Sequence, residues 1–212
     1  MPSNLTRRLS AQDAAFLYLE RPSAPLHIGS LGVYEGCISF ERFVTHMNSR
    51  MPLIPRYRQR LAFVPLGVAH PTWEDDPQFD IRNHVRRVSL PPPGNDQQLR
   101  ELTAKLFAEP LDRGKPLWET YVIEGLEGAR TGIVSKVHHA MVDGVSGIEL
   151  LMAILDLSPE PAPPPEPPPW EPKPLPEAGV RLADAFWDQL SQRLDLVQEF
   201  QETLIDPQPR LR

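Results

Sequence analysis

Residues 132–144 read Gly132-Ile-Val-Ser-Lys-Val-His-His-Ala-Met-Val-Asp-Gly144, and this stretch decides the architecture of the chain. Its apolar and β-branched beginning predicts a buried strand that ends in two adjacent histidines. The aspartate-glycine pair then predicts a sharp turn into a helix over about residues 145–157. A second apolar run over residues 117–123 is separated from the first by a glycine-containing turn, which predicts a neighbouring strand.

The rest of the body of the chain alternates between the helical and the strand period. Ser10, Ser39 and Asn95 each precede apolar residues at helical spacing, so each is an expected N-cap, with the first helix over residues 11–19. Further strands are expected over residues 26–34, 60–64 and 84–89. This irregular alternation predicts an α/β fold with a mixed β-sheet flanked by helices.

Proline is concentrated in one segment, PEPAPPPEPPPWEPKPLP, at residues 159–176. Because proline fixes φ and removes a donor, this segment is expected to be an extended linker between a body at 1–158 and a tail at 177–212. Apolar residues of the tail recur at helical spacing and predict one amphipathic helix about 25 residues long. That helix either docks on the protein or lies on a membrane. Docking is favoured because its polar face is poor in Lys and Arg.

The bulk composition limits the classes of partner. The net charge of −6 and the pI of about 5.5 argue against nucleic acid, since phosphate recognition needs a concentrated basic face. The single cysteine, Cys37, excludes an intrachain disulfide and is expected to be a buried free thiol in a reducing cytosol. No secretory signal and no apolar run of ~20 residues are found, so any membrane contact is expected to be peripheral.

The adjacent histidines point to proton transfer rather than to a metal. Neighbouring strand residues face opposite sides, so only one of His138 and His139 can face a given pocket, whereas zinc-binding pairs share a face. A histidine titrates at about pH 6.5 and can accept a proton from a hydroxyl. Asp143 either orients that imidazole or, as we favour, pairs with an arginine that fixes the turn. On pattern alone a structural role remains the commoner one for histidines in a strand.

Residues 138–144 match the HHxxxDG signature of the acyltransferase superfamily, which includes chloramphenicol acetyltransferase, the condensation domains of peptide synthetases and the bacterial wax ester synthases. Further blocks, in the same order along the chain, resemble the bifunctional wax ester synthase/acyl-CoA:diacylglycerol acyltransferase family: residues 9–20, 25–31, 55–61, 116–119 and 136–139. The resemblance extends over about residues 5–157.

The resemblance implies a chloramphenicol-acetyltransferase-like domain that forms the N-terminal half of a two-domain enzyme, with the reaction channel between the halves. The implied reaction moves a long-chain acyl group from acyl-CoA to diacylglycerol or to a fatty alcohol. Acyl-CoA is then a co-substrate, and neither a cofactor nor a metal is expected. The implied location is the cytoplasm, or the surface of the inner membrane or of lipid droplets.

The resemblance also assigns roles to single residues. His139 is implied as the general base, with His138 and Asp143 in support and Gly144 shaping the turn beside the substrate channel. The family's PLW block corresponds here to Pro116, Leu117 and Trp118, a structural or channel-side element.

Members of the family are about twice as long as this chain, so the chain is expected to lack the second domain. It is also expected to turn over little by itself, because stabilisation of the oxyanion is usually the largest single contribution in acyl transfer. Two alternatives remain: a lipid- or partner-binding module that uses the tail helix, and a peptide-synthetase-type condensation domain.

Overall fold

The computed structural model describes residues 8–142, 152–155, 158 and 169–190. Its main helices and strands, in chain order, are α1 (Ala11–Leu19), β1 (His27–Glu35), α2 (Phe40–Arg50), β2 (Gln59–Ala62), β3 (Thr72–Asp75), β4 (Val85–Ser89), α3 (Asp96–Ala108), β5 (Trp118–Leu126) and β6 (Arg130–His138). Residues 178–190 are also helical.

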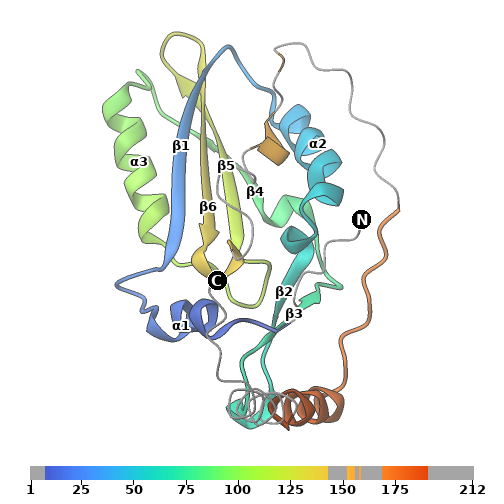
Figure 1. Ribbon diagram of the computed structural model, residues 1–212. Coiled ribbons are helices and arrows are strands. Elements are labelled where there is room, and N and C mark those ends of the chain that lie inside the picture. The colour runs from blue at the N-terminus through green and yellow to red at the C-terminus, as the bar shows by residue number, and fades with distance from the viewer. Residues whose placement is uncertain (1–7, 143–151, 156–157, 159–168, 191–212) are drawn as a thin grey trace, which may run out of the picture.

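Within the described residues, four strands form one sheet in the order β1-β6-β5-β4, and β2 pairs with β3 in a second, smaller sheet. β6 is antiparallel to both of its neighbours, whereas β4 and β5 run parallel. The large sheet lies between α3 on one face and α2 on the other (Figure 1). The predicted mixed sheet flanked by helices is therefore confirmed.

Each face of the sheet carries its own apolar cluster because side chains alternate along a strand. Tyr121 and Ile123 of β5 pack with Leu99 of α3. Val122, which points to the other side, belongs to the cluster that contains Phe43 of α2. The strand period along β5 thus divides the core into two layers.

Local chemistry sets the predicted helix starts. Ser10 Oγ accepts the Asp13 N–H at 3.1 Å, and Asn95 forms a reciprocal capping box with Gln98. The four-residue strand β3 was not predicted, because so short a run has no clear periodicity.

The prediction that Cys37 is a buried thiol was wrong, since the residue is exposed. It follows Gly36, whose φ of 89° turns the chain at the surface between β1 and α2.

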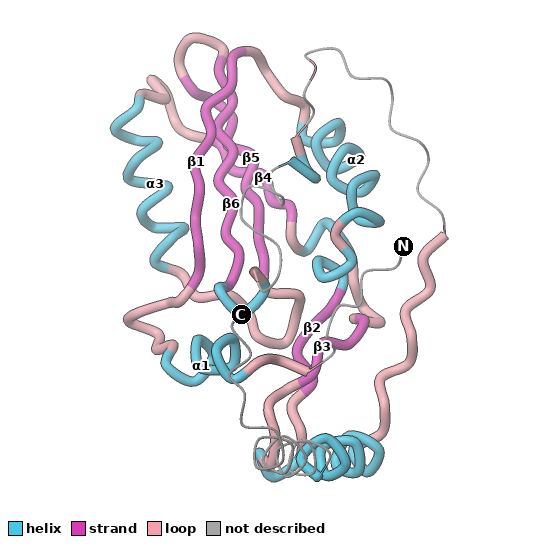
Figure 2. Tube along the Cα trace, viewed as in Figure 1, coloured by secondary structure: helices cyan, strands magenta, loops and turns pink. Residues whose placement is uncertain are grey.

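The described part of the linker lies along the body. The Trp170 ring stacks edge-on against Phe79 at 5.9 Å between centroids, and the Arg58 guanidinium lies 4.7 Å from the centroid of the Trp170 ring. The backbone N–H of Lys173 donates to Asp75 Oδ2 at 3.0 Å. Figure 2 shows this segment as an extended loop that leads into the helix at 178–190.

In that helix Ala185 is fully buried, and polar side chains bond to the body. Arg181 donates to the Phe63 carbonyl at 3.0 Å, and Gln189 donates to the Val68 carbonyl at 2.6 Å. Phe186, on the apolar face predicted from the helical period, is 63% exposed. The described helices include none with the length and apolarity to cross a bilayer. The predicted boundaries of linker and tail extend into residues outside the described ranges and stay predictions.

Candidate functional site

The two histidines lie at the end of β6, inside the sheet and between two neighbouring strands. The His138 N–H donates to the Leu117 carbonyl at 3.0 Å on the β5 side, and the His139 N–H donates to the Leu26 carbonyl at 3.1 Å on the β1 side. β6 ends at His138, one residue earlier than predicted, because the backbone turns there into the 3₁₀ turn His139–Met141. Hydrogen bonds on the β5 side and on the β1 side therefore fix the backbone of the two histidines.

His138 is sealed inside the protein, with a relative exposure of 0%. Its Nδ1 accepts the Ala140 N–H at 3.0 Å, so the proton of the neutral ring is carried by Nε2. Nε2 lies 3.4 Å from Glu20 Oε1, without the alignment of a hydrogen bond. Burial lowers the pKa of His138 to about 4, although the Glu20 carboxylate opposes that shift. This histidine is therefore neutral at cytosolic pH.

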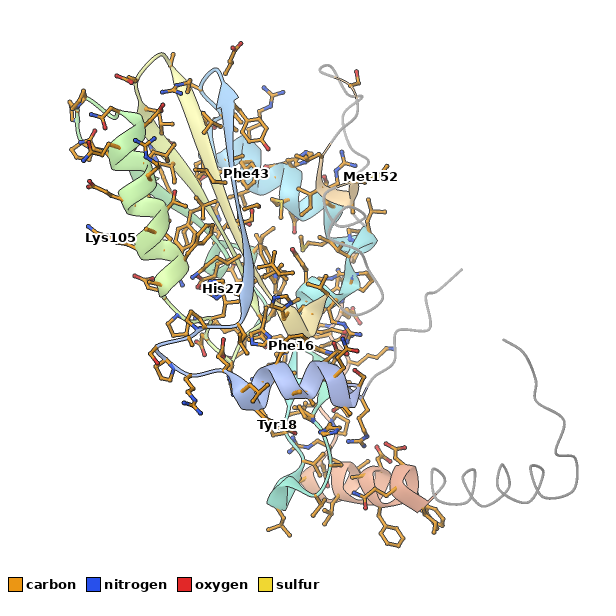
Figure 3. All side chains as sticks on the ribbon, turned by 60° about the vertical axis from the view of Figure 1, so that its left-hand side comes forward. Phe16, Tyr18, His27, Phe43, Lys105 and Met152 are labelled. Carbon is orange, nitrogen blue, oxygen red and sulfur yellow. The ribbon has the colours of Figure 1, made fainter. Side chains whose placement is uncertain are left out.

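His139 has a different environment. Its ring is half-buried and stacks on Phe16 of α1, with centroids 4.7 Å apart and planes 16° apart. In Figure 3, Phe16 projects from α1 toward the end of the sheet, whereas Tyr18 projects from the opposite side of the helix. Of the two histidines, only His139 is partly exposed to solvent, as a proton acceptor for an external hydroxyl requires.

The other predicted site residues fall into two groups. Asp143 and Gly144 lie outside the described residues. Pro116, Leu117 and Trp118 are buried, and the Leu117 carbonyl bonds to the His138 backbone. These observed contacts hold the end of β6. Contact of the three residues with substrate stays a prediction.

Sequence reasoning missed an ion pair beside the histidines, between the buried carboxylate of Glu20 and the partly exposed guanidinium of Arg113. The Glu20 side chain is 5% exposed, and its Oε2 accepts from Arg113 Nη2 at 2.8 Å and Nε at 3.2 Å. Burial by itself raises the pKa of Glu20, but the bonds from Leu26 and Arg113 hold it below its ordinary value. Glu20 and Arg113 are 93 residues apart in sequence, so no local pattern joins them. The sequence signal that could have pointed to Glu20 is its position as the last residue of the family-like block at residues 9–20.

A second buried charge lies farther along β6. The Lys136 ammonium, fully buried, is 3.1 Å from Glu119 Oε2 and donates to the Glu109 carbonyl at 3.0 Å. Burial, and then the charge of Lys136, lowers the pKa of His27, which pairs with His138 in the sheet register. Among the residues described, no group of three or more His, Cys, Asp or Glu is arranged to hold a metal ion.

The buried His138 predicts a loss of stability as the pH falls from about 6.5 to about 4. Its folded pKa of about 4 lies below the ordinary value for histidine of about 6.5. The unfolded chain therefore binds more protons in this window, and the free energy of unfolding rises with pH there, by about 3 kcal/mol at most. Urea unfolding from about pH 7 to about pH 4 measures this dependence.

His138→Gln is expected to flatten that pH dependence, although not completely, because burial also lowers the pKa of His84. Equal slopes for His138→Gln and the unmodified chain would show that His138 does not contribute.

A mixed sheet with helices on both faces, and a histidine pair where a central strand ends, define a chloramphenicol-acetyltransferase-like domain. The family model for the wax ester synthase/diacylglycerol acyltransferase catalytic domain matches residues 9–206. The chain belongs to that family. The predicted family is therefore confirmed.

Relatives and solved structures agree with this assignment. The probable diacylglycerol O-acyltransferase tgs3 of Mycobacterium tuberculosis is 44% identical over 160 residues, which cover 74% of this chain and 59% of that protein. The putative diacylglycerol O-acyltransferase MT3172 of the same species is 41% identical over 187 residues, which cover 86% of this chain and 39% of that protein. The chain therefore spans between 39% and 59% of the length of these two relatives.

The wax ester synthase/diacylglycerol acyltransferase of Marinobacter aquaeolei VT8 superposes with a TM-score of 0.62 at 28% identity, over 76% of this chain and 39% of that one. The starter condensation domain of rhizomide synthetase superposes with a TM-score of 0.51 at 17% identity, over 65% of this chain and 34% of that chain. The second likeness concerns the fold alone.

Proposed function

We propose that this chain is the histidine-bearing half of an enzyme that transfers a long-chain acyl group from acyl-CoA to diacylglycerol or to a fatty alcohol. His139 is the general base in this proposal. The observation that supports it most directly is the contrast within the histidine pair: His138 is sealed and its Nδ1 is occupied, whereas His139 is half-buried.

In the proposed reaction, His139 accepts the proton of the acceptor hydroxyl while the oxygen attacks the thioester carbonyl. The tetrahedral intermediate then collapses, the carbon–sulfur bond breaks, and the CoA thiolate takes the proton back from the imidazolium. The stack on Phe16 and the backbone bond to Leu26 limit how the His139 ring can turn. A base that is held in place in this way loses little orientation entropy when the acceptor arrives.

We further propose that a second domain completes the channel and supplies the oxyanion donors, since the chain spans only part of its relatives. Acyl-CoA, the lipid acceptor and that second domain are then the partners of the chain. The proposed location is the cytoplasm, at the surface of the inner membrane or of lipid droplets, where both kinds of acceptor are found.

Labelled palmitoyl-CoA tests the proposal. The complete enzyme is incubated with it and either diacylglycerol or a long-chain alcohol, and the neutral lipids are separated; the purified 212-residue chain is assayed in parallel. We expect triacylglycerol or wax ester from the complete enzyme and little product from the chain alone, because the proposal assigns the oxyanion donors to the second domain. Absence of ester from both acceptors would refute acyl transfer. Full turnover by the chain alone would refute the need for a second domain.

A lipid- or partner-binding module is the rival function. It is favoured by one observation, the exposure of Val180, Phe186 and Trp187 on the helix at 178–190. The same assay separates the two functions, because a binding module retains the lipid but forms no ester.

A further inference from the structure

We infer that Glu20 is a positioning residue for the histidine pair and that Arg113 holds its carboxylate in place. The inference rests on the proposed acyl-transfer function, because it assigns to Glu20 a role in orienting His139. The supporting evidence is a chain of contacts that begins at the end of α1 and reaches both histidines.

Glu20 connects the end of α1 to the segment that precedes β1 and to Arg113, which is 93 residues away in sequence. It directly follows α1, and its own N–H donates to the Phe16 carbonyl at 3.1 Å. Its Oε1 accepts the Leu26 N–H at 2.9 Å, and its Oε2 accepts from Arg113. Arg113 in turn donates to the Leu17 carbonyl of α1 at 2.6 Å. The carboxylate thereby fixes the end of the helix against the segment that enters β1.

The contacts continue from Glu20 to His139 by two routes. Leu26 donates its N–H to Glu20 and accepts the His139 N–H on its carbonyl, so one peptide segment joins the carboxylate to the backbone of the proposed base. Phe16 lies one helical turn before Glu20 on α1, and its ring stacks on His139. Figure 3 shows Phe16 at the end of the sheet, near the start of β1 where His27 is labelled.

A third contact reaches His138. Because the Ala140 N–H occupies Nδ1, the ring proton lies on Nε2, which faces Glu20 Oε1 at 3.4 Å. A negative charge beside this N–H stabilises the tautomer that leaves Nδ1 free to accept from Ala140. Ala140 is inside the 3₁₀ turn that begins at His139. Glu20 therefore stabilises the turn that carries the proposed base.

Arg113 completes the arrangement because a buried carboxylate without a countercharge is strongly unfavourable. The described titratable groups that interact with this carboxylate are Arg113, His27 and His138, and His139 interacts in turn with His138. Arg113 is the permanent cation of this set. Glu20 and Arg113 therefore form an ion pair that holds the carboxylate in place, and the neutral His138 lies next to it.

The test combines histidine spectroscopy with kinetics on Glu20→Gln, which keeps the shape of the side chain and removes its charge. In the 212-residue chain with nitrogen-15 histidine, we expect the unmodified His138 to show one Nε2–H tautomer and its ring to give a sharp signal. In Glu20→Gln, we expect mixed His138 tautomers and a weaker contact between the Phe16 and His139 rings. In the complete enzyme, kcat should fall by about 10- to 100-fold, while KM for acyl-CoA should change less than about twofold.

Two further variants keep the test decisive. If Glu20→Gln fails to fold, the double variant Glu20→Gln with Arg113→Gln removes both charges together, and the same readouts apply. Glu41→Gln is the matched control, because it breaks the exposed Arg82–Glu41 pair far from the histidines. It should leave all signals and rates unchanged.

The outcomes are distinct. A folded Glu20 variant with unchanged histidine signals and an unchanged kcat overturns the inference. A loss of stability without any change in tautomer or in ring contact also overturns it, since the pair would then be only structural. If His139→Ala retains full activity while Glu20→Gln still alters the histidine signals, the proposed general-base role of His139 fails and the positioning role stands.

Discussion

Replacing His139 with alanine is expected to lower acyl transfer by the complete enzyme by about 10²- to 10⁴-fold, the usual contribution of a general base. The fold should persist, because His139 is half-buried and the side-chain contact that the variant loses is the stack on Phe16. Single-turnover rates with labelled acyl-CoA measure the loss, and circular dichroism checks the fold. His70→Ala, at a histidine whose imidazole bonds to Tyr18, is the matched control.

A reduction below about tenfold would assign His139 a structural role instead. His138→Ala does not replace this test. That ring is fully buried and accepts a hydrogen bond from Ala140, so its removal leaves a cavity and disturbs the turn. A loss of activity in that variant would report on the fold as well as on the chemistry.

Replacing Trp118 with alanine is expected to cost about 3–5 kcal/mol of folding stability, a large part of the ~5–15 kcal/mol typical of a domain. The indole is 1% exposed and stacks between Tyr57 at 4.4 Å and His84 at 4.7 Å. Its Nε1 donates to the Tyr57 carbonyl at 2.8 Å. The substitution therefore removes a hydrogen bond and the centre of an aromatic stack together. Urea unfolding of the 212-residue chain measures the loss.

Trp187→Ala is the matched control, since that ring is 65% exposed and exposed substitutions usually change stability by less than about 0.5 kcal/mol. Trp118→Phe should cost less than the alanine variant, because the phenyl ring keeps part of the stack. If Trp118→Ala were as stable as the unmodified chain, the PLW block would have no structural role in the core.

The site shows where prediction from sequence stops. A strand that ends in the two histidines was expected over residues 132–139, and β6 spans Arg130–His138. The turn expected at Asp143 and Gly144 lies outside the described residues. The same pattern placed the two histidines on opposite sides. It did not say which ring is sealed, because that depends on α1, which precedes the pair by more than 100 residues.

The exposed positions show the same limit. Cys37 was expected in the core because free cysteines are often buried, yet it lies in a surface turn. Phe186 belongs to the apolar stripe of its helix and is exposed, whereas Ala185 of the same helix is buried and Arg181 and Gln189 bond to the body. Amphipathic spacing identifies the helix and does not choose which of its faces meets the protein.

By itself, the sequence determined the N-caps at Ser10 and Asn95, the strand pair β5–β6 and the family of the chain. These depend on residues a few positions apart, or on motifs that can be read directly along the chain. Only the tertiary structure decided that His138 is neutral and sealed, that His139 is partly open, and that Glu20 meets Arg113. The physical reason is that burial and ion pairing arise from groups far apart in sequence, and those groups meet only when the chain has folded.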